Sequence, residues 1–186
     1  MIDQIHLWHD HFVPGPALDI GAGDGEISLW LATRGIKVDA LEPDHQRART
    51  LRTRFASHAI QLHSHDVLEF GIPSEHYAVI IASAVLHFIE AEHLPGLAKR
   101  LIEGLIPGGM LFAAVFTCDD PSAQESQDGG VAHVRHYFER GELHQLFHPL
   151  DALHYEESRR AAPDSLYGYR SGATLVARRH LAPKTP

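Results

Sequence analysis

The chain has 186 residues, a length typical of one domain, and its 24 acidic against 16 basic side chains give a formal net charge of −8. This balance argues against a nucleic-acid partner, because such proteins neutralise phosphates with a basic face. The single cysteine excludes an internal disulfide framework, and no apolar run approaches the ~18 residues of a membrane span. The N-terminal stretch lacks the regions of a signal peptide, so we expect one cytoplasmic domain over residues 1–186 with no membrane partner.

Apolar runs and helical patterns alternate after a short N-terminal segment, residues 1–16. Five runs have the pattern of strands, and they lie at residues 17–21, 37–42, 60–66, 77–83 and 108–117. The fourth is apolar on both faces, as a central parallel strand is. Helical patterns separate most of these runs, at residues 26–35, 45–58 and 92–105. This alternation predicts a doubly wound parallel sheet with right-handed crossovers.

The pattern changes after residue 117. Residues 118–138 are polar, contain glycine and show no periodicity, which favours a lid over an acceptor site. A short helix at 141–147 follows, and then two strand-like runs at 151–160 and 171–180 with no helix between them. Such runs pair antiparallel. The sequence therefore predicts an α/β fold with a mostly parallel sheet of seven strands that ends in an antiparallel hairpin.

The most informative stretch is "ALDIGAGDGEISLWLA", which begins at Ala17 and places Gly21, Gly23 and Gly25 directly after the first strand. In an open α/β sheet, ligands bind beyond this end of the strands. Three alternating glycines exceed what a tight turn needs. Dinucleotide loops have the spacing G-x-G-x-x-G, whereas the third glycine here comes one residue early.

The charge of this loop narrows the choice of ligand. Asp19, Asp24 and Glu26 crowd the glycines and would repel a pyrophosphate. A cationic ligand is favoured instead. S-adenosylmethionine, with its sulfonium and ammonium groups, matches both the glycines and the carboxylates.

The stretch "LDIGAGDG" resembles the first motif of class I S-adenosylmethionine-dependent methyltransferases, and further motifs follow in the same order. They are "DALEPD", "HSHDV", "IIASAVLHF" and "IPGGMLFAAVF". The resemblance covers nearly all of residues 17–180. It implies a Rossmann-like doubly wound fold, S-adenosyl-L-methionine as the cofactor and methyl transfer as the activity.

The same resemblance implies a role for particular residues. The family's acidic residue at the position of Glu42 binds both ribose hydroxyls, and its aspartate at the position of Asp66 accepts from the adenine amino group. The next N–H, here of Val67, meets a ring nitrogen, and backbone carbonyls near Ser83 and Ala84 meet the ligand. The predicted cofactor-binding residues are Asp19, Gly21, Ala22, Gly23, Gly25, Glu42, Pro43, Asp66, Val67, Ser83 and Ala84.

Other stretches are similar to one group within this superfamily, the tellurite-resistance (TehB-like) methyltransferases. They are "VLHFIEAEHLPGL", "LIPGGMLFAAVF", "FERGELHQLF" and "ATLVARR". This similarity implies a small soft acceptor, such as a tellurium or selenium oxyanion or a thiol. The basic pair that the group carries in its final hairpin is approximated here by Arg159 and Arg160.

Two residues are candidates for the acceptor side. His87 follows the fourth strand, where the acceptor should approach the methyl group, and it could act as an acid–base catalyst, line the pocket or pack beneath the lid. Arg135 lies in the predicted lid and stays charged at every relevant pH, which suits an anionic acceptor. We therefore predict His87 and Arg135 as the catalytic residues that face a small-molecule acceptor.

The 16 histidines raise the question of a metal site. Zinc sites need three or four converging ligands, which no histidine group here offers by spacing, and we predict no functional metal. The groups considered are His6/His9/His11, His63/His65/Asp66, His133/His136 and His144/His148. Two other classes of protein stay open. One is a nicotinamide-dependent oxidoreductase, which the glycine spacing disfavours, and the other is a non-catalytic cofactor- or metal-binding module.

Overall fold

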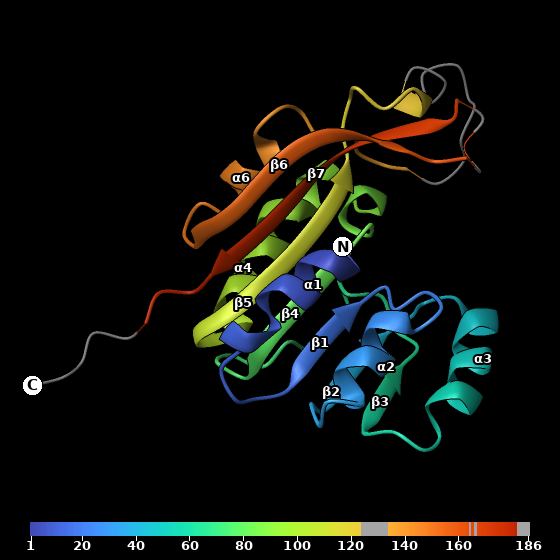
Figure 1. Cartoon of the computed structure of the whole chain (residues 1–186), viewed down its shortest axis with the longest axis vertical. Helices are drawn as coiled ribbons and strands as arrows, with labels where there is room; N and C mark the ends of the chain where they lie inside the picture. Colours follow the sequence, from blue (N-terminus) through green and yellow to red (C-terminus); the bar gives the residue numbers. More distant parts are fainter. Residues whose placement is uncertain (124–133, 164, 166, 182–186) are drawn as a thin grey trace, which may run out of the picture.

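The computed structural model describes residues 1–123, 134–163, 165 and 167–181. At its centre lies a seven-stranded sheet of order β3-β2-β1-β4-β5-β7-β6 (Figure 1). The strands are β1 (Ala17–Ile20), β2 (Val38–Leu41), β3 (Ile60–His63), β4 (Tyr77–Ser83), β5 (Leu105–Phe116), β6 (Asp151–Ala161) and β7 (Tyr169–Arg178). The first five pair in parallel, whereas β7 runs antiparallel to both β5 and β6. The predicted fold class is confirmed.

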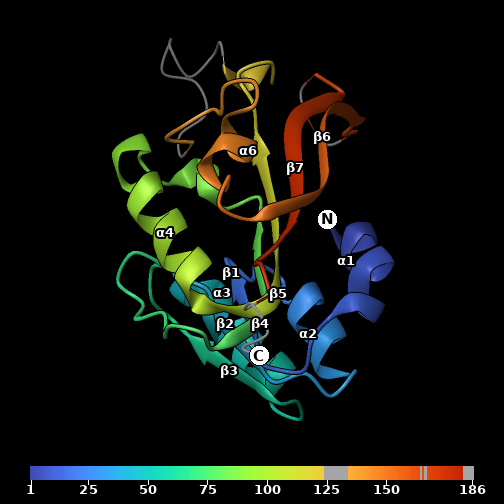
Figure 2. The same ribbon diagram turned by 90° about the vertical axis from the view of Figure 1, so that its left-hand side faces the viewer.

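Helices cover both faces of this sheet (Figure 2). One face packs against α1 (Ile2–Trp8), α2 (Glu26–Ala32) and α3 (His45–Phe55), and the other against α4 (Leu94–Gly104) and α6 (Glu142–Leu146). Three single-turn 3₁₀ helices connect the elements, η1 (His9–His11), η2 (Leu86–Phe88) and η3 (Ala91–His93). Because both faces are covered, β4 is buried along six of its seven residues, as its continuous apolar run predicts.

Helix α1 is the one helix of more than a single turn in the described part that the sequence analysis left out. Its seven residues are too few for a helical period to stand out from the pattern. Ile5 is nevertheless fully buried against the face that α2 and α3 cover. The predicted N-terminal segment therefore contributes to the core.

The C-terminal hairpin is inserted so that the last strand lies inside the sheet. β7 pairs with β5 on one side, where Phe116 lies opposite Gly172, and with β6 on the other. The β6–β7 register places Arg160 directly opposite Arg170. Residues paired in this way share one face of the sheet, so the insertion brings these two arginines together at the carboxyl end of β5.

Candidate functional site

A cavity of about 600 Å³ opens at the carboxyl ends of β1 to β4, where a doubly wound sheet binds its ligands. Arg47 and Arg135 bring positive side chains to its wall, His65 brings an imidazole, and Phe88 and Ile89 bring apolar side chains. The predicted cofactor residues that line it are Gly21, Glu42, Pro43, Asp66, Val67 and Ala84. Gly23 lines an adjoining hollow, and Asp19, Ala22, Gly25 and Ser83 lie on the same strand ends and loop without lining either space.

The loop after β1 needs glycine for both conformation and space. Gly21 has φ +68°, and a Cβ there would lie 2.9 Å from Cγ2 of Val85, on the cavity wall. Gly25 has φ +80°, and its Cβ would lie 2.6 Å from Cε1 of Phe55. L-residues with a side chain adopt such φ values at a cost. The loop therefore keeps its path only with glycine at these positions.

Glu42 fixes this loop to the end of β2. The residue is 4% exposed, and its Oε2 accepts from the N–H of Gly23 at 2.9 Å while Oε1 accepts from the N–H of Asp44 at 3.0 Å. Each carboxylate oxygen has a second lone pair, so Glu42 can also accept from two ribose hydroxyls. The same carboxylate thus shapes the loop and offers acceptors to a ligand.

Asp66 and Val67 stand in a loop that α4 holds in place. Oδ1 of Asp66 accepts from the N–H of Leu68 at 2.8 Å. Arg100 of α4 donates to the carbonyls of Leu68 at 3.1 Å and Val67 at 3.3 Å, and to that of Phe70. Nothing in the sequence indicated this role of Arg100, because a helical pattern does not show which loop an arginine reaches.

Asp19 is a buried acid at the end of β1, below the glycine loop. It is 2% exposed, and Oδ2 accepts from the hydroxyl of Ser28 at 2.6 Å. Burial raises the pKa of Asp19 to about 6, with the hydrogen bond from Ser28 acting against that rise. The carboxylate is therefore ionised at neutral pH and becomes neutral in mild acid.

This titration predicts a pH-dependent affinity for a cationic ligand. The sequence predicts that Asp19 attracts the ammonium of the cofactor, which S-adenosylhomocysteine keeps. Protonation below pH 6 would remove that negative charge, so affinity for S-adenosylhomocysteine should fall about tenfold from pH 7.5 to pH 5. Calorimetric titration across this range measures the effect. Asp19→Asn should bind weakly at every pH with a flatter profile, and an equally steep profile in that variant would assign the titration to another group.

A second, smaller cavity of about 120 Å³ adjoins the first at Ala84. Ala84 has φ +55°, and strained backbone of this kind concentrates at functional sites. The wall is built mainly from the ends of β5, β6 and β7, and it consists of Ala84, Ala114, Val115, Phe116, Ser158, Arg160, Arg170, Ser171, Gly172, Ala173 and Thr174. The sequence suggested Arg159 and Arg160 as the basic pair of the final hairpin. In the structure, the arginine that lies opposite Arg160 is Arg170. The guanidinium of Arg159 lies 5.1 Å from the ring centroid of Tyr169.

His87 lies between these features but lines neither cavity. It is fully buried, its ring stacks on that of Phe116 at a centroid distance of 4.3 Å, and its Nδ1 accepts from the N–H of Phe116 at 3.2 Å. Burial lowers the pKa of His87 to about 4. The ring is therefore neutral at physiological pH. It packs against Phe116, which is one of the residues that line the second cavity.

The backbone of Arg135 is hydrogen-bonded to that of His87, and the side chain of Arg135 lines the first cavity. The carbonyl of His87 accepts from the N–H groups of Arg135 at 2.9 Å and His136 at 3.1 Å. The side chain of Arg135 lines the first cavity, with Nε 3.7 Å from Oε1 of Glu90. The structure thus brings the two predicted catalytic residues together in the backbone, whereas their side chains occupy different places.

The predicted lid is described only at its ends. Residues 124–133, which include His133, lie outside the described residues, so the lid stays a prediction. Before them, Asp120 is buried in the turn after β5, and after them Phe138 is buried beside Thr117. Both ends are therefore anchored to the sheet.

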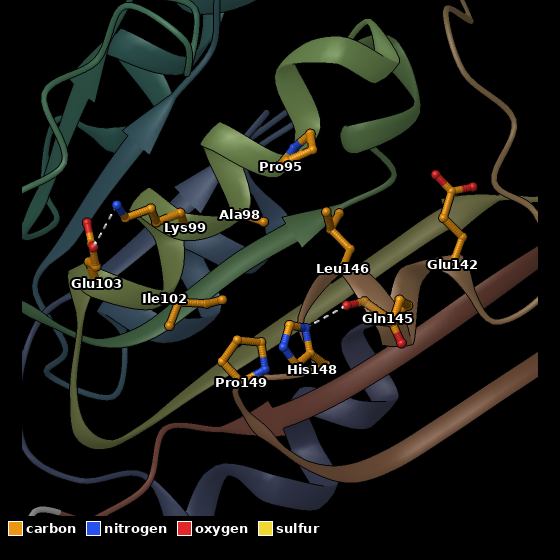
Figure 3. Close-up of a pocket in the computed structure, with 10 residues that line it drawn as sticks. All are labelled: Pro95, Ala98, Lys99, Ile102, Glu103, Glu142, Gln145, Leu146, His148 and Pro149. Carbon is orange, nitrogen blue, oxygen red and sulfur yellow. Dashed lines mark hydrogen bonds and ion pairs between the residues drawn. The ribbon is translucent and has the colours of Figure 1, made fainter.

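Another hollow lies away from the predicted site residues. A groove of about 520 Å³ runs between α4 and α6, with Lys99 and Glu103 paired on one side and His148 and Gln145 on the other (Figure 3). In the part of the chain that the structure describes, no three histidine, cysteine, aspartate or glutamate side chains are placed to hold a metal. None of the described helices has the length and apolarity to cross a bilayer.

A sheet of this order, with a glycine loop after β1 and acidic residues after β2 and β3, defines the class I fold of S-adenosylmethionine-dependent methyltransferases. The profile of the family described as "methyltransferase domain" matches residues 1–152, and the chain belongs to this family. Membership implies S-adenosylmethionine as the co-substrate. The site fits it, because Glu42 has lone pairs available to a ribose and Asp19 adds a carboxylate below the loop.

Two curated relatives illustrate the similarity. An uncharacterized methyltransferase of Mycobacterium tuberculosis is 33% identical over 100 residues, which are 53% of this chain and 49% of that protein. A protein-L-isoaspartate O-methyltransferase of Xylella fastidiosa is 33% identical over 127 residues, 65% of this chain and 52% of that protein. The chain thus spans about half the length of the curated relatives it matches.

Two solved structures share the fold. TehB from Haemophilus influenzae superimposes with a TM-score of 0.77 at 22% identity, over 96% of this chain and 60% of that one. A methyltransferase from Methanosarcina mazei superimposes with a TM-score of 0.76 at 16% identity, over 95% of this chain and 98% of that one. These identities show a common fold and no more.

Proposed function

We propose that the protein transfers a methyl group from S-adenosylmethionine to a small anionic acceptor in the second cavity, with a metalloid oxyanion or a thiolate as the best candidates. The observation that supports this most is the arginine pair on the cavity wall. Arg160 and Arg170 lie opposite each other on adjacent strands, and like charges in such a pair destabilise a sheet. An anion between them would reverse that effect.

Each arginine keeps donors for a ligand. Arg170 uses Nη1 to contact Asp120, and Arg160 uses Nη2 to contact Glu156 at 3.5 Å. A guanidinium has five N–H donors in a planar fork, which matches the geometry of an oxyanion. The volume of about 120 Å³ suits a small acceptor, and the shared wall at Ala84 supports an approach to the first cavity.

The chemistry requires little from the chain beyond position. S-adenosylmethionine supplies an electrophilic methyl carbon and a leaving group that departs as a neutral thioether. Arg160 and Arg170 would hold the acceptor, while Ala84 and Phe116 would exclude water. A neutral His87 is a weak base with a pKa of about 4, so we assign it the support of Phe116. Arg135, at the wall of the first cavity, is a candidate for contacts with the cofactor or the acceptor.

The similarity to the tellurite-resistance group supports the choice of acceptor. We extend that similarity to this chain as part of the proposal, and we place the protein in the cytoplasm because its single cysteine suits a reducing compartment. Titration with S-adenosylhomocysteine and with NAD tests the cofactor against the oxidoreductase alternative. Turnover on selenite, tellurite, thiols and small carboxylates then tests the acceptor. No turnover on any of them would remove this function and favour the binding-module alternative.

Replacing Arg160 tests the second cavity directly. Arg160→Gln should raise the KM for an anionic acceptor about 10- to 100-fold, because it removes a charge-assisted contact worth ~1.5–3 kcal/mol. Arg159→Gln is the matched control, since this neighbouring arginine stacks over Tyr169 and does not line the cavity. Steady-state kinetics at saturating cofactor measure both variants. Equal KM values for the two variants would exclude Arg160 from the acceptor site.

A further inference from the structure

Asp120 is a buried acid at the start of the predicted lid, and it is not among the predicted site residues. It lies in the turn after β5, where its N–H donates to the carbonyl of Thr117 at 2.8 Å, and its side chain is fully buried. A buried carboxylate costs several kcal/mol unless donors surround it. The hydrogen-bond donors around Asp120 must therefore offset the cost of burying its charge.

Four donors converge on the Asp120 carboxylate. Oδ2 accepts from the N–H of Ser171 at 2.8 Å. Oδ1 accepts from the N–H of Ser122 at 3.0 Å, from the Ser122 hydroxyl and from Nη1 of Arg170 at 3.1 Å. The carboxylate thus ties the turn after β5 to the first residues of β7, and Arg170 is its one charged partner among the described residues.

Arg170 is held from two further sides. Nη1 also donates to Oγ of Ser122 at 2.9 Å, and the guanidinium carbon lies 5.2 Å from the ring centroid of Phe116. Nε and Nη2 make no hydrogen bond to the described part of the chain. Arg170 is one-third exposed and lines the second cavity, so these donors are available to a ligand.

We infer that Asp120 is a positioning residue for the acceptor: it holds the Nη1 edge of Arg170 and thereby leaves the Nε and Nη2 edge to an anion in the second cavity. This inference rests on the proposed function. An arginine that is one-third exposed samples many rotamers in solvent unless a partner fixes it, and each rotamer lost on binding weakens affinity. Asp120 removes that cost before the acceptor arrives.

A purely structural role for Asp120 gives a different expectation. Its contacts to the N–H groups of Ser171 and Ser122 would then be the whole of its contribution, and a variant would lose stability without changing acceptor affinity. The two roles therefore differ in the mobility of the Arg170 guanidinium and in the KM for the acceptor.

The test compares Asp120→Asn with Glu75→Gln in the full chain loaded with S-adenosylhomocysteine. Glu75 pairs at 2.7 Å with Arg179, the residue that follows the C-terminal end of β7, so its variant removes an arginine partner away from the cavity. Nitrogen-15 NMR of the arginine side chains reports hindered rotation of the Arg170 guanidinium. We expect it to be slow in the wild type and in Glu75→Gln and fast in Asp120→Asn.

Kinetics supply the second readout. Asp120→Asn should raise the KM for selenite or another anionic acceptor about tenfold, with kcat and the KM for S-adenosylmethionine nearly unchanged, and Glu75→Gln should leave all three as in the wild type. Unchanged Arg170 rotation in Asp120→Asn would overturn the inference. If the wild type methylates no anionic acceptor, the proposed function fails, whereas the NMR comparison still decides the role of Asp120.

Ser122→Ala covers the case in which Asp120→Asn does not fold. This variant keeps the carboxylate and removes one of the two Nη1 contacts. Rotation of the Arg170 guanidinium should become faster than in the wild type but stay slower than that of an exposed arginine. Wild-type rotation in Ser122→Ala would then reject the positioning role.

Discussion

Replacing Glu42 with alanine is expected to weaken the binding of S-adenosylhomocysteine by at least about 100-fold. Two charge-assisted hydrogen bonds to the ribose would be lost, at ~1.5–3 kcal/mol each. Two hydrogen bonds within the protein would also be lost, because the N–H groups of Gly23 and Asp44 both donate to the Glu42 carboxylate. The glycine loop would then have to be ordered by the ligand. Isothermal titration calorimetry measures the affinity directly.

Two further variants separate geometry from charge. Glu42→Gln keeps the shape of the side chain but presents an amide N–H₂ to one backbone N–H, so its affinity should lie between those of the wild type and Glu42→Ala. Glu26→Ala removes an exposed acidic side chain in the first turn of α2 that lines neither cavity. Its affinity should change less than about threefold, as expected for an exposed charge. Wild-type affinity in Glu42→Ala would remove Glu42 from the ribose site.

Gly25→Ala is expected to destabilise the protein more than Gly35→Ala, the other glycine-to-alanine substitution proposed here. Forcing alanine to φ +80° costs ~1–2 kcal/mol, and overpacking against Phe55 and Leu51 adds ~1–3 kcal/mol. The melting temperature should therefore fall by about 5–15 °C for a chain of this size. Cofactor affinity should fall as well, because Gly25 is the N-cap residue of α2 and its N–H donates to the carbonyl of Ala22 within the loop.

Gly35→Ala provides the matched control for this effect. Gly35 has the same φ of +80°, but a Cβ there would meet no atom within 4 Å. Its loss of stability should therefore reflect backbone strain alone, at ~1–2 kcal/mol. The difference between the two variants in chemical denaturation measures the overpacking term. An equal loss in both would show that Phe55 and Leu51 move aside without cost.

Local sequence was sufficient to predict most of the sheet. The run at 77–83 coincides with β4, because a strand between two covered faces needs apolar residues on both sides. The prediction for β5 began at residue 108, whereas the strand begins at Leu105, which pairs with Tyr77 across an irregularity in the ladder. A proline and two glycines within that stretch concealed its start, because such residues usually mark turns.

The two halves of the candidate site differ in how far sequence could predict them. The cofactor cavity is formed by residues that directly follow β1, β2, β3 and β4, so strand ends alone indicate them. The second cavity depends on register. Arg170 faces Arg160 only because of the length of the hairpin turn, and it meets Asp120 only because β7 enters the sheet beside β5. His87 shows the same limit, because the short helix after β4 turns its side chain into the core.

The insertion of β7 between β5 and β6 also sets the order in which the two cavities can form. All residues of the first cavity's wall except Arg135 lie between Ile20 and Ile89, so they precede β5, β6 and β7 in the chain. The second cavity needs residues from 84 to 174, and its inner strand, β7, is synthesised after the other six strands of the sheet. A nascent chain can therefore form most of the wall of the first cavity before the residues of the second cavity are available.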